Sequence, residues 1–315
     1  MRRREFIAGL GAAAWPLGAK AQQSDQVRRI GVLISLAESD AEAQARLAAL
    51  AQGLREFGWT EGRNYRFEFR GIAGGGMDRI RAAVAQLVAS SPDVVHATNT
   101  LIVQELQRQT RTVPIVFASI SDPVDTGVVA SLAHPGGNAT GFQNVEPQFA
   151  GKYLQLLKEV APGLNRVLVM VNAGNDANQS ILRVIEALAP TFGVQVSSAA
   201  VRDAAEIESA IEAIARQPNA GLIIPAGIPI NDRRKLNFAL AARYKLPAFY
   251  LFRFFVVDGG LMSYGPDILD IYRRSAAYVD RILKGEKPGD LPVQVPVKYE
   301  LGACPSIRKS PSPAE

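Results

Sequence analysis

The sequence contains little cysteine and little histidine, the side chains on which many catalytic and metal sites depend. Its 315 residues include one cysteine, Cys304, and two histidines, His96 and His134. A single cysteine cannot form a disulfide within the chain or build a cysteine-based metal site. Neither histidine has the second histidine or the acidic cluster nearby in the sequence that a catalytic or metal-binding histidine requires. We therefore expect no metal and no cofactor.

Long apolar runs and common enzyme motifs are also missing. After residue 21, no stretch reaches the roughly 18 apolar residues of a membrane span. The longest candidate, residues 246–262, is interrupted by Arg253 and Asp258. Three glycines at residues 74–76 lack the lysine and the hydroxyl residue that complete a nucleotide P-loop. The Gly-x-Ser-x-Gly turn of serine hydrolases is absent. These absences predict that the protein is not an enzyme.

Residues 1–21 have the features of an export signal that is cleaved after Ala21. Three arginines at residues 2–4 precede an apolar stretch at residues 6–17, and Ala-Lys-Ala at residues 19–21 provides the small residues of a cleavage site. The arginine pair followed by Glu-Phe-Ile resembles the twin-arginine signal. An arginine-rich signal of the general secretory route is the alternative. Both interpretations place the mature protein in the periplasm.

The excess of positive charge lies mainly in this first segment. The whole chain has a formal charge of +5, whereas residues 22–315, with 31 basic and 29 acidic side chains, have a charge of +2. A protein that binds nucleic acid needs a concentrated basic surface to neutralise phosphates. The near balance after residue 21 therefore predicts that nucleic acid is not a partner.

From residue 28 onward, short β-rich runs alternate with amphipathic helical stretches, the pattern of parallel α/β architecture. The pattern restarts near residue 148, so we expect two α/β halves divided near residues 143–147. The first half is expected to have strands at residues 30–35, 65–69, 94–97, 115–119 and 139–143, and helices at 41–57, 78–89, 101–109 and 124–132. The second half is expected to have extended segments at residues 166–171, 194–199, 220–225, 247–252, 261–263 and 293–299, and helices at 148–160, 178–188, 204–215, 233–244 and 268–283.

Small polar residues recur where the expected strands end. In open parallel sheets, ligands bind beyond the carboxyl ends of the strands, near helix N-termini. Two tyrosines join the candidates because they lie in or near an aromatic segment and carry a polar tip. Any one of the small polar residues can instead cap a helix, but their recurrence in both halves predicts one shared polar crevice. The candidate ligand contacts are Ser35, Asn99, Ser119, Ser121, Asp122, Asn144, Asn172, Asn175, Tyr250 and Tyr264.

Four segments resemble a known family. They are FASISDPV at residues 117–124, SLAHPGGNATG at 131–141, GGLMSYG at 259–265 and YVDRILKG at 278–285. Over about residues 28–301, the chain resembles the ABC-transporter substrate-binding protein family that includes tryptophan and tyrosine binders. The resemblance implies a type I periplasmic-binding-protein fold, in which two Rossmann-like lobes joined by hinge strands enclose the ligand. Residues 252–258 are less acidic than in the family, and residues 302–315 differ from its C-terminal strand and helix.

The resemblance implies an exported protein that captures a small molecule by hinge closure and delivers it to an inner-membrane ABC permease. Asp122 would hold an ammonium group and hydroxyls or backbone amides a carboxylate, so an amino acid or related compound is the expected ligand. A monomer is expected. The alternatives are an exported enzyme, redox-active for example, and a ligand-sensing subunit of a membrane receptor. The first lobe would comprise residues 28–144 and about 266–290, the second residues 145–265 and about 291–301, and a disordered tail residues 302–315.

The twin-arginine interpretation can be tested on the precursor. Arg3→Lys combined with Arg4→Lys should leave the precursor in the cytoplasm, because the export machinery recognises the arginine pair. Cell fractionation with immunoblotting measures this, and N-terminal sequencing of the exported wild type should begin at Gln22. Continued export of the double variant would contradict twin-arginine export and leave the solute-binding interpretation intact.

Overall fold

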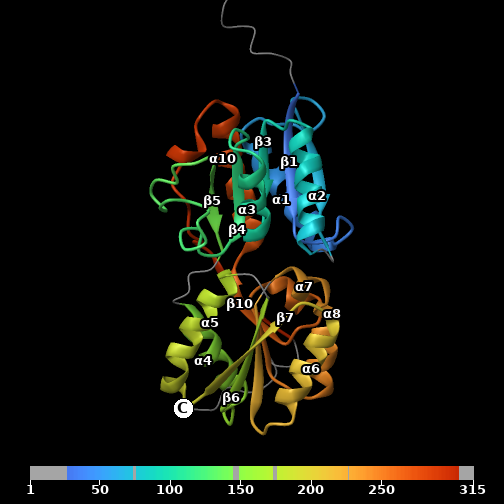
Figure 1. Ribbon diagram of the computed structural model, residues 1–315, viewed down its shortest axis with the longest axis vertical. Coiled ribbons are helices and arrows are strands. Elements are labelled where there is room, and N and C mark those ends of the chain that lie inside the picture. The colour runs from blue at the N-terminus through green and yellow to red at the C-terminus, as the bar shows by residue number, and fades with distance from the viewer. Residues whose placement is uncertain (1–26, 74–75, 145–148, 173–175, 226, 305–315) are drawn as a thin grey trace, which may run out of the picture.

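The computed structural model of the protein describes residues 27–73, 76–144, 149–172, 176–225 and 227–304. The expected export signal, Asn175 and most of the expected tail lie outside these residues. Figure 1 shows two lobes arranged along the long axis of the molecule, each with helices around a central sheet. The first sheet has five strands and the second has six. The α/β class predicted from the sequence is confirmed.

The first lobe is built on a parallel sheet of order β2-β1-β3-β4-β5. All strands except the edge strand β2 are buried along most of their length, as expected for a sheet covered on both faces. The elements are β1 (Arg28–Ile34), α1 (Ala41–Glu56), β2 (Tyr65–Gly71), α2 (Met77–Ala89), β3 (Val94–Ala97), α3 (Thr100–Gln109), β4 (Ile115–Ile120) and β5 (Ala139–Gln143).

The second lobe contains a sheet of order β11-β10-β9-β8-β6-β7 in which β11 alone is antiparallel to its neighbour. β11 continues to Ala303, two residues into the expected tail. The strands are β6 (Arg166–Asn172), β7 (Gln195–Val201), β8 (Ala220–Ile224), β9 (Ala248–Tyr250), β10 (Met262–Pro266) and β11 (Tyr299–Ala303). The helices are α4 (Ala150–Val160), α5 (Asp176–Leu188), η2 (Ala189–Phe192), α6 (Ala204–Ala215), α7 (Ile228–Asp232), α8 (Arg234–Arg243) and α9 (Arg253–Val257).

Helix α10 (Ile268–Leu283) follows β10 of the second lobe but packs on the first lobe. It lies so close to α1 that a Cβ at Gly53 would come within 2.1 Å of the Arg273 carbonyl oxygen. The buried His96 ring on β3 shares a 2.8 Å hydrogen bond with the Ser275 hydroxyl. Burial lowers the pKa of His96 to about 3, so this neutral histidine serves to fasten α10 to the first sheet.

After α10 and the short helix η3 (Pro288–Asp290), the chain runs beside β5 and then returns to the second lobe as β11. The Gln143 amide donates to the Gln294 carbonyl at 3.0 Å, and the Gln294 amide donates to the Gly141 carbonyl at 2.8 Å. Further along, the Asp267 amide donates to the Lys298 carbonyl at 2.9 Å. The chain therefore crosses between the lobes three times, after β5, after β10 and before β11.

The helix predicted at residues 124–132 does not form. Gly127, within this segment, has a φ angle of +70°, which lies in the left-handed region and interrupts a right-handed helix. Asp122, just before the segment, has a φ of +46°. The amides of Val128 and Val129 both donate to the Pro123 carbonyl, at 2.9 and 3.0 Å. The segment is therefore a series of turns, which places Asp122 in a bend after β4. Within the described ranges, no helix combines the length and the apolar character needed to cross a membrane.

Candidate ligand-binding site

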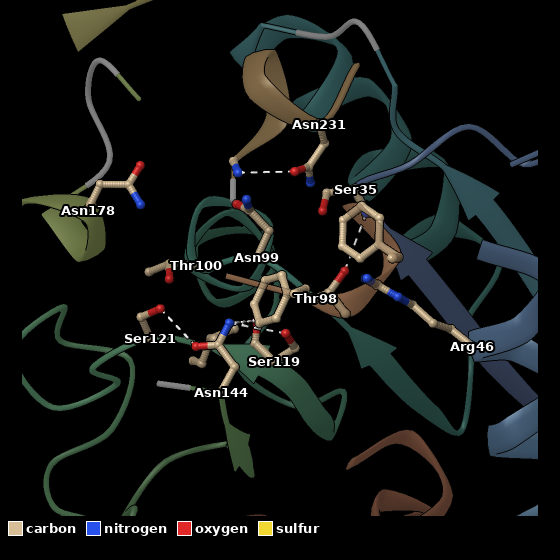
Figure 2. Close-up of a pocket in the computed structure, with 14 residues that line it drawn as sticks. Ser35, Arg46, Thr98, Asn99, Thr100, Ser119, Ser121, Asn144, Asn178 and Asn231 are labelled. Atoms are coloured by element: carbon tan, nitrogen blue, oxygen red, sulfur yellow. Dashed lines mark hydrogen bonds between the residues drawn. The ribbon is translucent and has the colours of Figure 1, made fainter. Parts of the chain in front are cut away.

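A polar pocket lies between the two lobes, where the parallel strands end. Its first-lobe wall comes from the residues after β1 and β3, from the junction of β4 and β5, and from α1; its second-lobe wall comes from α5, α7, α9 and neighbouring turns. Small-molecule sites in proteins are concave and carry a few placed polar groups, as this pocket does. Figure 2 shows the fourteen lining residues, which are Ser35, Arg46, Thr98, Asn99, Thr100, Ser119, Ile120, Ser121, Asn144, Asn178, Gly227, Asn231, Phe252 and Phe254.

A β-bulge at Ser119 shapes the end of β4. The pairing of β4 with β5 shifts register between Ala118 and Ile120, and Ser119 has a φ of +63°. Such bulges re-aim a side chain, and strained backbone concentrates at functional sites. Asn144 fixes this region, because its Nδ2 donates to the Ser119 hydroxyl at 3.1 Å and its Oδ1 accepts from the Ser121 hydroxyl at 2.8 Å (Figure 2). Asn144 thus positions two hydroxyls of the pocket.

The turn after β3 places three polar residues in succession on the pocket wall. Asn99 has a φ of +72°, and its Oδ1 accepts from the Leu101 amide at 2.9 Å, which caps α3. The side-chain NH2 is therefore the group that Asn99 offers to a ligand. The neighbouring Thr98 hydroxyl accepts from the Ser35 amide at 3.3 Å, which joins the ends of β3 and β1. At Asn99, helix capping and pocket lining coincide in one residue.

Asparagines form much of the second-lobe wall. The Asn178 Oδ1 accepts from the Asn172 amide at 2.9 Å, and the Asn231 Oδ1 accepts from the Gly227 amide at 3.3 Å. A Cβ at Gly227 would lie 3.2 Å from side-chain atoms of Asn172, so a glycine allows the chain to pass directly over Asn172. These bonds fix Asn178 and Asn231 on the pocket wall and leave Asn172 behind it.

The structure brings five of the residues predicted from the sequence together on the first-lobe wall. They are Ser35, Asn99, Ser119, Ser121 and Asn144. Two further candidates lie close to the pocket without lining it: Asp122 directly follows a lining serine, and Asn172 is buried beneath the second-lobe wall. Asn175 is outside the described residues.

Tyr250 and Tyr264 do not belong to the residues that line the pocket. Tyr250 is 1% exposed, and its ring packs against those of Phe238 and Phe255. Burial raises the pKa of the Tyr250 hydroxyl. The Tyr264 ring stacks on that of Tyr299, with 5.9 Å between the ring centroids. Both rings therefore pack within the second lobe, outside the lining of this pocket.

Three prominent lining residues, Arg46, Phe252 and Phe254, were not predicted from the sequence. Both phenylalanines lie in the aromatic segment at residues 250–255, but the preference for a side chain with a polar tip selected Tyr250 instead. Arg46 lies on the buried side of α1, three residues after Ala43 and four before Leu50 in the sequence. A charged side chain at this apolar helical spacing is a sequence signal for a buried charge.

The lobes also make contact beside the pocket, through Arg234 of α8. Its Nη2 lies 2.8 Å from Oδ2 of Asp40, the N-cap residue of α1, and its Nε bonds to Asp258. The Arg234 and Asp40 side chains are 15% and 10% exposed, so solvent and salt screen this pair less than a surface pair. The Phe254 ring centroid lies 6.0 Å from the Arg234 guanidinium and 5.3 Å from that of Arg46. Two arginines and one ring therefore connect the lobes.

Residues 29–302 match the family described as ABC transporter substrate binding protein. The chain belongs to this family. The resemblance carried by the four sequence segments is thereby confirmed. Several solved structures of similar shape are ABC transporter solute binding proteins, and their likeness confirms the expected two-lobed type I periplasmic-binding-protein fold.

Three similar proteins illustrate the relationship. A tyrosine-binding protein of Clostridioides difficile (strain R20291) is 23% identical over 242 residues, which cover 77% of this chain and 69% of the relative. A structure from Streptococcus pneumonia, described as an ABC domain in complex with L-Trp, has a TM-score of 0.82 and 25% identity, with 90% of this chain and 94% of the other covered. A ligand-free, open substrate-binding protein from Clostridium difficile has a TM-score of 0.65 and 22% identity, with 91% and 97% covered.

The ion pair between the lobes predicts a measurable shift in their separation. Asp40→Asn keeps an N-cap, because asparagine caps as well as aspartate, but it removes the charge that pairs with Arg234. The loss should cost about 1–2 kcal/mol of attraction between the lobes. We expect small-angle X-ray scattering of the ligand-free variant to give a larger radius of gyration than the wild type.

The matched control is Asp203→Asn. Asp203 caps α6 in the same way, through a 2.9 Å bond from the Glu206 amide, but its side chain is exposed and caps within the second lobe. Its scattering curve should match that of the wild type. If Asp40→Asn is folded and also matches the wild type, the pair with Arg234 does not influence lobe separation.

Proposed function

We propose that this protein is an exported solute-binding protein that closes its two lobes over an amino acid or a related small molecule and delivers it to an inner-membrane ABC permease. Binding and release would occur in the periplasm, by a monomer, without chemical change to the solute. Closure follows when a ligand contacts both lobes, because such a ligand binds the closed state more tightly than the open one.

The observation that carries this proposal is the polar pocket that both lobes line. Its walls consist mainly of hydroxyl and amide side chains, with Phe252 and Phe254 as the aromatic members. Pockets of this type orient a small ligand by a few placed polar groups and use aromatic surface for affinity. The pocket lies beyond the carboxyl ends of the strands in both lobes, the usual place for a ligand in open parallel sheets.

Asp122 supports an ammonium-bearing ligand. Burial and the nearby Asp125 carboxylate raise the pKa of Asp122. In the described part of the chain, the groups that act on this carboxylate include the Ser180 hydroxyl of α5 but no cationic side chain. A half-buried carboxylate without a cation gains from an ammonium that arrives with the ligand. Ser180 belongs to the second lobe, and its interaction with Asp122 supports a role for Asp122 at the interface that closure would complete.

The similar proteins indicate which solutes to test first. One relative is named for tyrosine, and one solved structure contains L-Trp. Phe252 and Phe254 give this pocket aromatic surface against which such side chains could pack. Aromatic amino acids are therefore the first ligands of our proposal, with other amino acids next.

A thermal-shift screen of the mature protein tests the proposal. The panel should contain amino acids, sugars, polyols and nucleosides, because a solute-binding protein is stabilised by its solute. A ligand at 100 times its dissociation constant stabilises the folded state by about 2.7 kcal/mol. We expect stabilisation by an amino acid and no change in the solute recovered after binding. Consumption of the solute, or a bound chromophore in the purified protein, would favour an enzyme instead.

Asp122→Asn should lower the affinity for an ammonium-bearing ligand by about 10- to 150-fold, because a charge-assisted hydrogen bond contributes about 1.5–3 kcal/mol. Isothermal titration calorimetry with L-tyrosine or L-tryptophan measures this. Because an ammonium favours the ionised carboxylate, wild-type affinity should fall as pH falls through the raised pKa of Asp122, and the variant should lose this dependence. Unchanged affinity in a folded variant would reduce Asp122 to a residue of the turn.

A further inference from the structure

Arg46 is the one ionisable side chain among the fourteen residues that line the pocket. It lies on α1 of the first lobe, on the same side of the helix as the buried Leu50, and is only 5% exposed. A buried arginine is costly unless its charge and its N–H groups have partners. The partners of Arg46 within the protein therefore determine which of its N–H donors are available to a ligand.

The surroundings of Arg46 hold its guanidinium without using all of its donors. Its Nε donates to Glu42 Oε1 at 2.8 Å, one helical turn away. The ring centroids of Phe254 and Tyr272 lie 5.3 and 5.8 Å from the guanidinium carbon. Burial raises the pKa of Tyr272, so this phenol is neutral. Its hydroxyl interacts with the guanidinium but does not compensate the positive charge. Glu42 is the carboxylate that compensates it, and it binds at Nε alone.

Arg46 lines the pocket, and the contacts with Glu42 and Tyr272 leave N–H donors of its guanidinium for a ligand. Figure 2 shows Arg46 reaching from α1 toward Thr98 and Ser35. The Ser35 hydroxyl also lines the pocket. A guanidinium presents its donors as a planar fork that matches the two oxygens of a carboxylate. Arg46, with a hydroxyl beside it, is therefore arranged as a subsite for a planar anion.

We propose that Arg46 binds the carboxylate of the solute. This inference rests on the proposed solute-binding function and adds that the ligand carries an acidic group. It also orients the ligand. Figure 2 shows Arg46 on one side of the pocket and Ser121 and Asn144 on the opposite side. Asp122 is the residue after Ser121 in the chain. An amino acid would then place its carboxylate at Arg46 and its ammonium toward Asp122.

Pairs of an amino acid and its amide test this assignment, because each pair differs in the carboxylate. Suitable probes are L-tyrosine with L-tyrosinamide and L-tryptophan with L-tryptophanamide, measured by calorimetry at about pH 6.5, where the amino groups are protonated. Wild-type protein should bind the acid about 10- to 100-fold more tightly than the amide. Arg46→Met should lower the affinity for the acid by a similar factor and change the affinity for the amide by no more than about threefold. The preference for the acid should therefore disappear.

The matched control is Arg274→Met. Arg274 also lies over an aromatic ring, 5.3 Å from the Phe142 centroid, and pairs with Asp270, but it is not among the lining residues. This variant should keep the preference for the acid. Arg46→Lys provides a second variant with the charge retained and the fork removed, and we expect it to keep part of the preference. Circular dichroism checks that each variant is folded.

Three results would overturn the assignment in different ways. If Arg46→Met lowers the affinities for acid and amide equally, Arg46 stabilises the contact between the lobes or the core and does not bind the carboxylate. If the wild type binds sugars, polyols or amides but not acids, solute binding stands and the carboxylate assignment is wrong. If no solute of the thermal-shift panel or these pairs binds, the proposed function itself fails, and the assignment fails with it.

Discussion

The parallel pairing of strands in both sheets is the constraint on which the binding site depends. Parallel strands end at the same edge, so the turns after β1, β3, β4 and β5 converge although they are far apart in the sequence. Each such turn that leads into a helix favours a short polar residue as its cap. Asn99 is the clearest case, because its oxygen caps α3 while the residue lines the pocket. The same short polar residues thus cap the helices and make the pocket polar.

Under the proposed function, the connections between the lobes would allow this pocket to open and close. The chain crosses three times, yet each lobe remains internally fastened; α10 is held to the first lobe by bonds such as Trp59 Nε1 to Asp280 at 2.9 Å. Two rigid bodies joined by a few segments favour hinge motion over internal rearrangement. The contacts of Arg234 with Asp40 and of Phe254 with Arg46 join the two lobes and would stabilise a closed state. A solute that touches both walls would supply the remaining difference in free energy.

Hydrophobic periodicity predicted most of the fold, and two helices, Ala204–Ala215 and Ile268–Leu283, begin and end where it placed them. It failed at residues 124–132, because left-handed backbone angles are not visible in a pattern of apolar residues. In the site, polar residues at strand ends were predictable from the parallel order alone. Arg46 and the inward-facing phenylalanines were not, since which side of an element faces a cleft between lobes depends on tertiary packing.

Under the proposed assignments, the two lobes have different tasks. Arg46 and Asp122, the two charged groups assigned to the ligand, both belong to the first lobe, whereas the second-lobe wall consists of amides, a glycine and two phenylalanines. Charge attraction acts over several ångströms, but hydrogen bonds and ring contacts require close approach. A zwitterionic solute would therefore bind first to the open first lobe, and the uncharged wall would close over it afterwards. Because that wall brings no charge of its own, closure would strengthen the electrostatic contacts by excluding water from them.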